Sequence, residues 1–393
     1  MPEIADSINK TNAFYCLECG KCTAACPIAL VNSSFSPRSI VGHTLLSTEE
    51  ETLADPLLWA CLTCKACEDI CPVSVDYSTL MLELRAKGSE YGQKGLCSHG
   101  GALQSLMRIM TDLEIKPNRM DWLDDDLKIA DEGEYLFFVG CAPYLDVFFA
   151  DLGAATLDAA KGVIRTLNAL GIEPVVLPDE RCCGHDLLWS GDQENFKRLA
   201  ESNLDQIKAA GAKKVIFSCA ECYRAVKNDY AEFFGALDFE TVHITEIVAE
   251  KMADEKPLFT SNNRQTKVTY HDPCRLGRHL GVYDAPRNVI NALPGVELQE
   301  MIKSGKNALC CGVSNWMNCT VYSKQIQVER LKQAKETGAD TLLTACPKCE
   351  IHLRCAMKDP HFSDELTIEL KDVATLTAES ISVPKTDQNN LNE

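Results

Sequence analysis

The chain has 393 residues, of which 46% are apolar, and a formal charge of −18. This charge excludes nucleic acid and anionic membrane surfaces as general partners, because both would repel the protein and no basic cluster offsets the repulsion. The length predicts two or three domains. No apolar run is long enough for a secretory signal or a membrane helix, so we expect a cytoplasmic protein without direct membrane insertion, free or attached to the membrane through a partner.

Cysteine is the outlier in this composition. The 21 cysteines are grouped in short motifs and are not scattered as isolated pairs. In a chain without a secretory signal, such groups predict metal ligation or redox chemistry and not a disulfide framework.

The N-terminal part contains one cysteine motif twice, with the spacing C-x2-C-x2-C-x3-C-P. In this motif three thiolates on a tight loop hold one cubane, and the fourth, before proline, reaches a second cubane. The spacing therefore predicts two [4Fe–4S] cubane clusters. The first is assigned to Cys16, Cys19, Cys22 and Cys71, and the second to Cys61, Cys64, Cys67 and Cys26. Structural zinc is the alternative, since paired C-x2-C motifs also form tetrathiolate sites, although zinc does not need the proline-terminated pattern.

Helical patterns at 38–52 and 79–87 predict that these motifs belong to an all-helical ferredoxin-like domain over residues 1–95. A glycine-rich stretch and an acidic segment follow. They predict a connector, which we assign to residues 96–134.

The C-terminal half contains two tandem copies of a unit of about 130 residues. Each copy has a single cysteine, then Cys-Cys-Gly, then C-x2-C. The first set is Cys141, Cys182, Cys183, Cys219 and Cys222, and the second is Cys274, Cys310, Cys311, Cys346 and Cys349. We assign the first repeat to residues 135–258 and the second to 259–384, and we expect a disordered polar tail at 385–393.

Short apolar runs alternate with helical patterns in both repeats, which predicts parallel sheets covered by helices. The predicted strands are 135–139, 175–177, 215–217, 268–270 and 341–343, and the predicted helices are 157–170, 194–209 and 322–334. Ligands of such sheets gather at the carboxyl ends of the strands, where Cys141, Cys219 and Cys346 stand. Five thiolates exceed the needs of a cubane. Adjacent cysteines fit one tetrahedral zinc site poorly but can contact different irons of an extended cluster.

At these residues the chain resembles the CCG-domain iron–sulfur proteins, most closely the D-type subunit of heterodisulfide reductase, which is similar to a fusion of the C and B subunits. The resemblance includes the ferredoxin motifs, the Cys-Cys-Gly elements, HDPC (His271 to Cys274) and CPKC (Cys346 to Cys349). It implies an α+β multidomain fold, in which a ferredoxin-like module precedes two tandem α/β CCG domains. It also implies that each set of five cysteines holds a noncubane [4Fe–4S] cluster, and that a disulfide is cleaved between the two clusters.

The resemblance implies an oxidoreductase subunit that passes electrons through two cubanes to two noncubane [4Fe–4S] clusters for disulfide or thiol chemistry. It would work within a larger electron-transfer or electron-bifurcating complex of anaerobic metabolism. One alternative is a non-catalytic electron conduit for a flavoprotein, quinone-linked or aromatic-CoA reductase partner, and another is a zinc-binding interaction protein. No flavin or nucleotide fingerprint is visible, so we expect a flavin-bearing subunit or a membrane cytochrome to supply electrons.

Two histidines beside the cysteine motifs, His185 and His271, are candidate catalytic proton donors, the second together with Asp272. The alternative is that they donate hydrogen bonds to cluster sulfur and tune its potential.

Several other residues near the motifs receive weaker predictions. Arg275, Arg278, His279 and Lys348 are candidates for holding an anionic substrate or offsetting cluster charge, with surface solvation as the alternative for Arg278 and His279. Trp59, Trp189 and Trp316 are predicted to shield clusters from water, and Cys97, Cys319 and Cys355 to be small buried residues.

Overall fold

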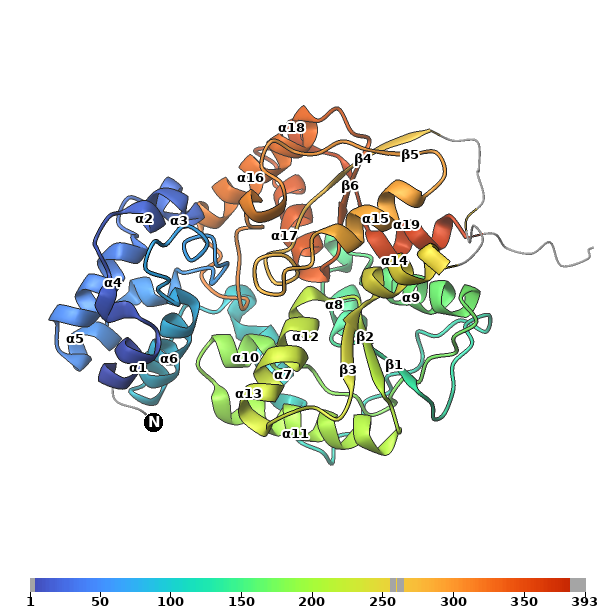
Figure 1. Cartoon of the computed structure of the whole chain (residues 1–393), viewed down its shortest axis with the longest axis horizontal. Helices are drawn as coiled ribbons and strands as arrows, with labels where there is room; N and C mark the ends of the chain where they lie inside the picture. Colours follow the sequence, from blue (N-terminus) through green and yellow to red (C-terminus); the bar gives the residue numbers. More distant parts are fainter. Residues whose placement is uncertain (1–3, 255–258, 260–264, 382–393) are drawn as a thin grey trace, which may run out of the picture.

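The computed structural model describes residues 4–254, 259 and 265–381, and the tail predicted at 385–393 lies outside this range. The chain forms a helical N-terminal module and two α/β units, which confirms the predicted α+β multidomain fold. In Figure 1 the N-terminal module, in blue, lies beside the two units, in green and orange. None of the described helices is long and apolar enough to cross a membrane.

Short helices build the N-terminal module. They are α1 (Ile4–Lys10), η1 (Ala13–Tyr15), α2 (Lys21–Ala25), α3 (Pro27–Val31), α4 (Pro37–Leu46), α5 (Glu49–Leu53), η2 (Pro56–Trp59) and α6 (Tyr77–Glu90). The single helix predicted over 38–52 is divided into α4 and α5. The reason is local: the Thr48 side chain accepts from the backbone N–H of Glu51, and the Glu51 carboxylate accepts from the N–H of Thr48, so a capping box starts a new helix there.

The connecting segment contains η3 (Ser98–Gly101) and α7 (Ala102–Ile109). Leu103 and Met107 of α7 are buried, while Ile109 is 53% exposed, as expected for an amphipathic helix packed on the neighbouring domains. The Gln104 amide donates to the carbonyls of Asn315 and Trp316, both at 3.1 Å, which fixes α7 against the second repeat. The segment predicted as a plain connector therefore contributes packed structure.

The first repeat forms a three-stranded parallel sheet in the order β1-β2-β3. Its elements are β1 (Tyr135–Phe138), α8 (Ala142–Phe148), η4 (Ala150–Leu152), α9 (Thr156–Ala169), α10 (His185–Trp189), α11 (Gln193–Ala209), β2 (Lys214–Phe217), α12 (Ala220–Arg224), the π-helix η5 (Ala225–Tyr230), α13 (Ala231–Phe234), β3 (Glu240–His243) and α14 (Ile244–Asp254). The strand predicted at 175–177 is reduced to parallel bridges, one of them between Val175 and Leu136 of β1.

The second repeat forms a four-stranded parallel sheet in the order β5-β4-β6-β7. Its elements are β4 (Thr266–Tyr270), α15 (Asp284–Ala292), β5 (Val296–Leu298), η6 (Gly305–Asn307), α16 (Val321–Glu336), β6 (Thr341–Thr344), α17 (Pro347–Met357), α18 (Ser363–Leu366), β7 (Glu369–Asp372) and α19 (Val373–Glu379). If the bridge at Val175 is counted as the counterpart of β5, both sheets have the same strand order.

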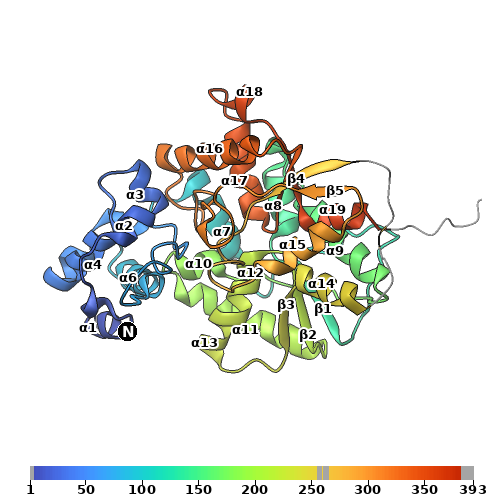
Figure 2. The same cartoon turned by 45° about the horizontal axis from the view of Figure 1, so that its top comes forward.

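The two repeats pack through reciprocal helix pairs, α9 against α19 and α14 against α15 (Figures 1 and 2). Because α9 and α15 occupy equivalent places in the two units, as do α14 and α19, the arrangement is close to two-fold symmetric. Gly162 of α9 permits one of these contacts, since a Cβ there would lie 2.7 Å from the carbonyl oxygen of Ala374 in α19. This packing turns the carboxyl ends of β2 and β6 toward one another.

Candidate metal centres

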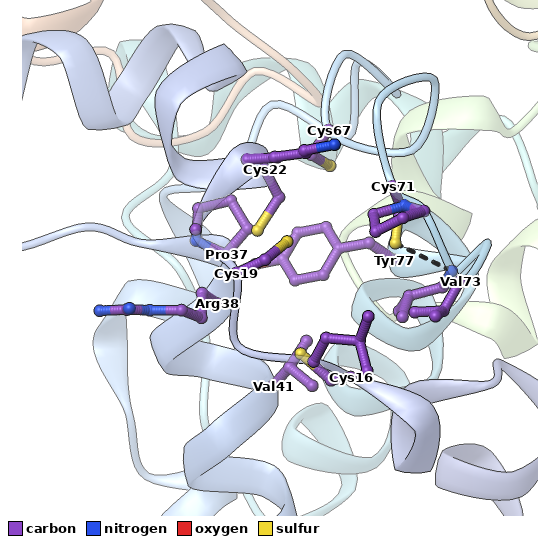
Figure 3. Close-up of a pocket in the computed structure, with 15 residues that line it drawn as sticks. Cys16, Cys19, Cys22, Pro37, Arg38, Val41, Cys67, Cys71, Val73 and Tyr77 are labelled. Carbon is purple, nitrogen blue, oxygen red and sulfur yellow. Dashed lines mark hydrogen bonds between the residues drawn. The ribbon is translucent and has the colours of Figure 1, made fainter.

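The first cysteine cavity lies in the N-terminal module, where the thiols of Cys16, Cys19, Cys22 and Cys71 surround an open centre (Figure 3). Left-handed backbone at Glu18 and Gly20 turns the loop so that its three cysteines face the same space. Cys71 arrives from the other motif, and its sulfur accepts a hydrogen bond from the N–H of Val75 at 3.4 Å.

The second cavity is lined by Cys61, Cys64, Cys67 and Cys26. Thr63 and Lys65 have positive φ and repeat the tight turn of the first loop. Each motif thus sends its fourth cysteine to the other cavity, and both predicted sets of four are brought together.

The third cavity belongs to the first repeat and is lined by all five of its motif cysteines. Cys141 and Cys219 follow β1 and β2 and precede α8 and α12, so both stand at the carboxyl edge of the sheet. The glycine of the Cys-Cys-Gly element has a definite role. Gly184 has φ +76°, and a Cβ there would lie 2.8 Å from the Phe196 ring, so no other residue fits this turn without movement.

The five cysteines of the second repeat lie close enough together for their thiols to shift one another's pKa values. Cys310 contacts Cys274 and Cys311, and Cys349 contacts Cys311 and Cys346. Gly312 repeats the role of Gly184, with φ +88° and a Cβ position 2.7 Å from the carbonyl oxygen of Ser323.

Two thiol contacts connect these groups in a line. Cys64 of the second cavity lies within hydrogen-bonding reach of Cys310, and Cys346 lies within reach of Cys219 in the first repeat. Contact with Cys310 lowers the pKa of Cys64 to about 5, and the nearby guanidinium groups of Arg278 and Arg275 act in the same direction. The order along the line is N-terminal module, second repeat, first repeat.

A group of basic residues after Cys274 holds the loop of the second cavity. Arg275 donates to the Thr63 carbonyl and, at 2.7 Å, to the Thr63 hydroxyl, while Arg278 donates to the Cys64 carbonyl at 2.5 Å. The Nε2 atom of His279 lies 2.8 Å from the Thr63 carbonyl oxygen. The alternative of surface solvation for Arg278 and His279 is therefore wrong, because both side chains are half-buried and are hydrogen-bonded to the backbone of the N-terminal module.

The hydrogen bonds of His185 define its tautomer. Arg275 Nε donates to His185 Nε2 at 2.9 Å, and arginine cannot accept a hydrogen bond. The ring proton therefore sits on Nδ1, which lies 3.0 Å from Asp186. Burial lowers the pKa of His185, which favours the neutral ring. These contacts favour a positioning role for His185 over proton donation.

His271 is arranged differently. Arg330 Nε donates to His271 Nδ1 at 2.9 Å, which leaves the proton on Nε2, and the imidazole lies within 4.8 Å of the sulfur of Cys311. His352, which was not predicted, brings its Nδ1 to 3.5 Å from the same sulfur. Asp272, the other proposed donor, is held by Arg287 at 2.7 and 3.0 Å. The position of His271 therefore favours the role of a hydrogen-bond donor to cluster sulfur over that of a catalytic proton donor.

Lys348 lies in a buried charge cluster that the sequence did not reveal. Its ammonium group pairs with both Asp186 and Glu221 from the first repeat. Burial raises the pKa of Glu221 to about 7, while His185 and Lys348 oppose that shift. Glu221 and Lys348 occupy the same position in the two C-x2-C elements, so this pair forms close to the pseudo-two-fold axis. Lys348 is thus already neutralised and is not available for an anionic substrate.

The remaining predictions concern three tryptophans and the three cysteines outside the motifs. The three tryptophans are buried, and Trp316 lines the first-repeat cavity, which fits a shielding role. The prediction that Cys97, Cys319 and Cys355 are buried is wrong, since Cys319 is exposed and the other two are half-buried.

Gly140 offers a local test of the first-repeat cavity. Its φ is +66°, and a Cβ would lie 2.8 Å from the sulfur of Cys222. Gly140→Ala is expected to displace Cys222 or Cys141 and to remove about four irons from the purified protein, the content of one [4Fe–4S] cluster. Iron analysis measures the loss, and the EPR signals of clusters in the N-terminal module should remain. Gly171→Ala is the control, because Gly171 also has positive φ but open space around it. Equal iron contents in the two variants would contradict this prediction.

The donor sets fit iron–sulfur clusters. Each of the three cysteine cavities described above is lined by four or more cysteines, which is the thiolate-rich environment that such clusters require. Comparisons with known families agree. Residues 12–75 match the 4Fe-4S dicluster domain, and residues 135–227 and 268–354 match the cysteine-rich domain called CCG. The fold and the cysteine sets together define an iron–sulfur oxidoreductase subunit.

Comparison with individual proteins identifies the family within this class. The D-type polypeptide of dihydromethanophenazine:CoB–CoM heterodisulfide reductase from Methanosarcina acetivorans is 32% identical over 94% of this chain and 94% of its own length. The chain belongs to the family of D-type heterodisulfide reductase subunits. EtfAB:quinone oxidoreductase from Syntrophomonas wolfei is 30% identical over 76% of this chain but only 43% of its own length. A hypothetical protein from Helicobacter pylori shares the fold, with a TM-score of 0.57 and 13% identity over 98% of this chain and 78% of that one.

Proposed function

We propose that this subunit carries electrons from two cubane [4Fe–4S] clusters to a pair of noncubane [4Fe–4S] clusters, where a disulfide is reduced. The net reaction is R–S–S–R′ + 2 e⁻ + 2 H⁺ → RSH + R′SH. The electrons come one at a time from a redox partner, a flavin-bearing subunit or a membrane cytochrome. The functional precedent among the relatives is the D-type polypeptide of the Methanosarcina heterodisulfide reductase.

The observation that carries this proposal is the line of contacts between cysteines. Cys64 contacts Cys310, and Cys346 contacts Cys219, so each cysteine group in the two repeats has a neighbouring group within direct reach. When bound, the clusters supply one-electron carriers and thiophilic iron. The protein's own contribution is positional: Arg275 and Arg278 fix the loop that carries Cys64, and thereby its approach to Cys310.

The duplication of the five-cysteine set supports disulfide chemistry over a plain conduit. Reduction of an S–S bond needs two electrons and produces two sulfur atoms, and two adjoining five-cysteine sites provide one location for each. Cys346 and Cys219 meet where the repeats face each other. This arrangement supports the proposal that both halves of one disulfide are held between the two repeats.

Two measurements on anaerobically purified protein test the proposal. Metal analysis is expected to give about sixteen irons per chain, the content of four [4Fe–4S] clusters, whereas zinc without iron would overturn the assignment. Addition of a thiol to the oxidised protein is expected to produce a paramagnetic species that is absent without thiol. If iron is complete and no thiol-dependent signal forms, the conduit interpretation replaces the proposal.

A further inference from the structure

The cavity of the first repeat contains more than its cysteines. One wall consists of apolar side chains from three separate segments of the chain. They are Leu103, Leu106 and Met107 of α7, Leu145 of α8, and Trp316 of the second repeat. None of these residues belongs to a cysteine motif, and α7 lies in the segment between the N-terminal module and the first repeat.

The α7 helix is held in place firmly enough to shape this wall. Gln104, which is 2% exposed, anchors it to the second repeat through two carbonyl groups. Leu103 and Met107 are buried, and Leu106 is half-buried on the same side. Ile109, at the end of the same helix, is 53% exposed and does not line the cavity.

The ionisable groups of the cavity, apart from cysteine, are His185, Asp186, Glu221 and Lys348. Lys348 is the cationic residue among them, and both carboxylates pair with it. His185 accepts from Arg275 and donates to Asp186, so it is neutral. Among the described residues that line this cavity, no cation is left to pair with a sulfonate, carboxylate or phosphate, because Lys348 is already held by two carboxylates. A buried anion would therefore lack a counter-charge of its own.

We propose, on the basis of the function proposed above, that the sulfur compound bound at the first repeat carries an uncharged, apolar substituent next to its sulfur. An aliphatic or aromatic thiol, or the corresponding half of a disulfide, fits this description. Its hydrocarbon part packs on the α7 wall, where it is removed from water, while its sulfur faces the cysteine set.

The experiment titrates the oxidised, cluster-loaded full chain with 1-butanethiol and with 3-mercaptopropionate, and follows the thiol-dependent EPR signal. Half-saturation is expected at a concentration at least about tenfold lower for 1-butanethiol. Equal or tighter binding of 3-mercaptopropionate would overturn this inference and leave the proposed function intact. A lack of response to both thiols would overturn the proposed function and this inference with it.

A pair of variants on α7 assigns the preference to the wall. Leu106→Lys places a cation beside the cavity and is expected to remove or reverse the preference for 1-butanethiol. Ile109→Lys is the matched control, because it adds the same charge to the same helix outside the cavity, and its titrations should equal those of the unmodified chain. Iron content and the cubane signals report whether each variant folds. An unchanged preference in a fully loaded Leu106→Lys variant would show that α7 does not select the substrate.

Discussion

Replacing Cys311 with alanine, or its counterpart Cys183 in the first repeat, is expected to abolish thiol–disulfide turnover. Both cysteines are buried, and each is in contact with two other cysteines of its set. Outer partners of metal ligands alone are worth about 10- to 100-fold in activity, so the loss of a ligand should exceed 100-fold. The variants are expected to lose the thiol-dependent EPR species while the two cubane signals remain, because Cys311 and Cys183 are absent from both N-terminal cavities.

Cys319→Ala provides the matched control. Cys319 lies outside every cysteine set and is exposed, so its replacement should leave turnover, iron content and both kinds of signal unchanged. If Cys311→Ala or Cys183→Ala retained normal turnover, disulfide reduction could not depend on the paired five-cysteine sites.

The cysteine sets were predictable because their spacing is a local property. In the N-terminal motifs three cysteines share one tight loop, and in the repeats Cys141, Cys219 and Cys346 follow strands directly, so short-range sequence already limits where each sulfur can point. The strands with continuous apolar residues, such as Tyr135–Phe138, were predicted for the same reason. The apolar pattern of the sequence does not indicate the strands β3, β5 and β7. These strands are partly exposed and carry charged residues at positions where a buried strand has apolar ones.

The contacts that join the domains could not be predicted. Arg275 and Thr63 are 212 positions apart, and Lys348 and Asp186 are 162 apart, so no local pattern relates them. Basic residues beside a cysteine motif suggested anion binding, but their donors are used by backbone carbonyls and buried carboxylates. The apolar spacing of Leu103, Leu106 and Met107 was the one available signal for α7. It is short and directly follows a glycine-rich stretch, so it does not by itself predict a helix.

Replacing Arg275 with methionine is expected to destabilise the protein by about 3 kcal/mol or more, because charge-assisted hydrogen bonds to several buried acceptors are lost. The side chain is 2% exposed, donates to Thr63 and His185, and stacks 4.4 Å from the centre of the Trp189 ring. It therefore links the N-terminal module to both repeats. Methionine preserves much of the volume and the contact with the indole ring but leaves the Thr63 carbonyl and His185 Nε2 without this donor. Chemical unfolding of the loaded protein measures the stability change.

The same substitution should also slow electron transfer from the cubanes to the repeats, since Arg275 fixes the loop on which Cys64 approaches Cys310. Freeze-quench EPR after mixing with a one-electron reductant separates the two effects, because the cubanes should still reduce at the normal rate while the later clusters lag. Arg165→Met is the control: Arg165 is a partly exposed arginine paired with Asp124 and Asp126, and its loss should cost under about 1 kcal/mol. An Arg275→Met protein that unfolds and transfers electrons like Arg165→Met would show that the contact between Cys64 and Cys310 does not depend on this arginine, and the proposed electron path would then need another means of fixing its first step.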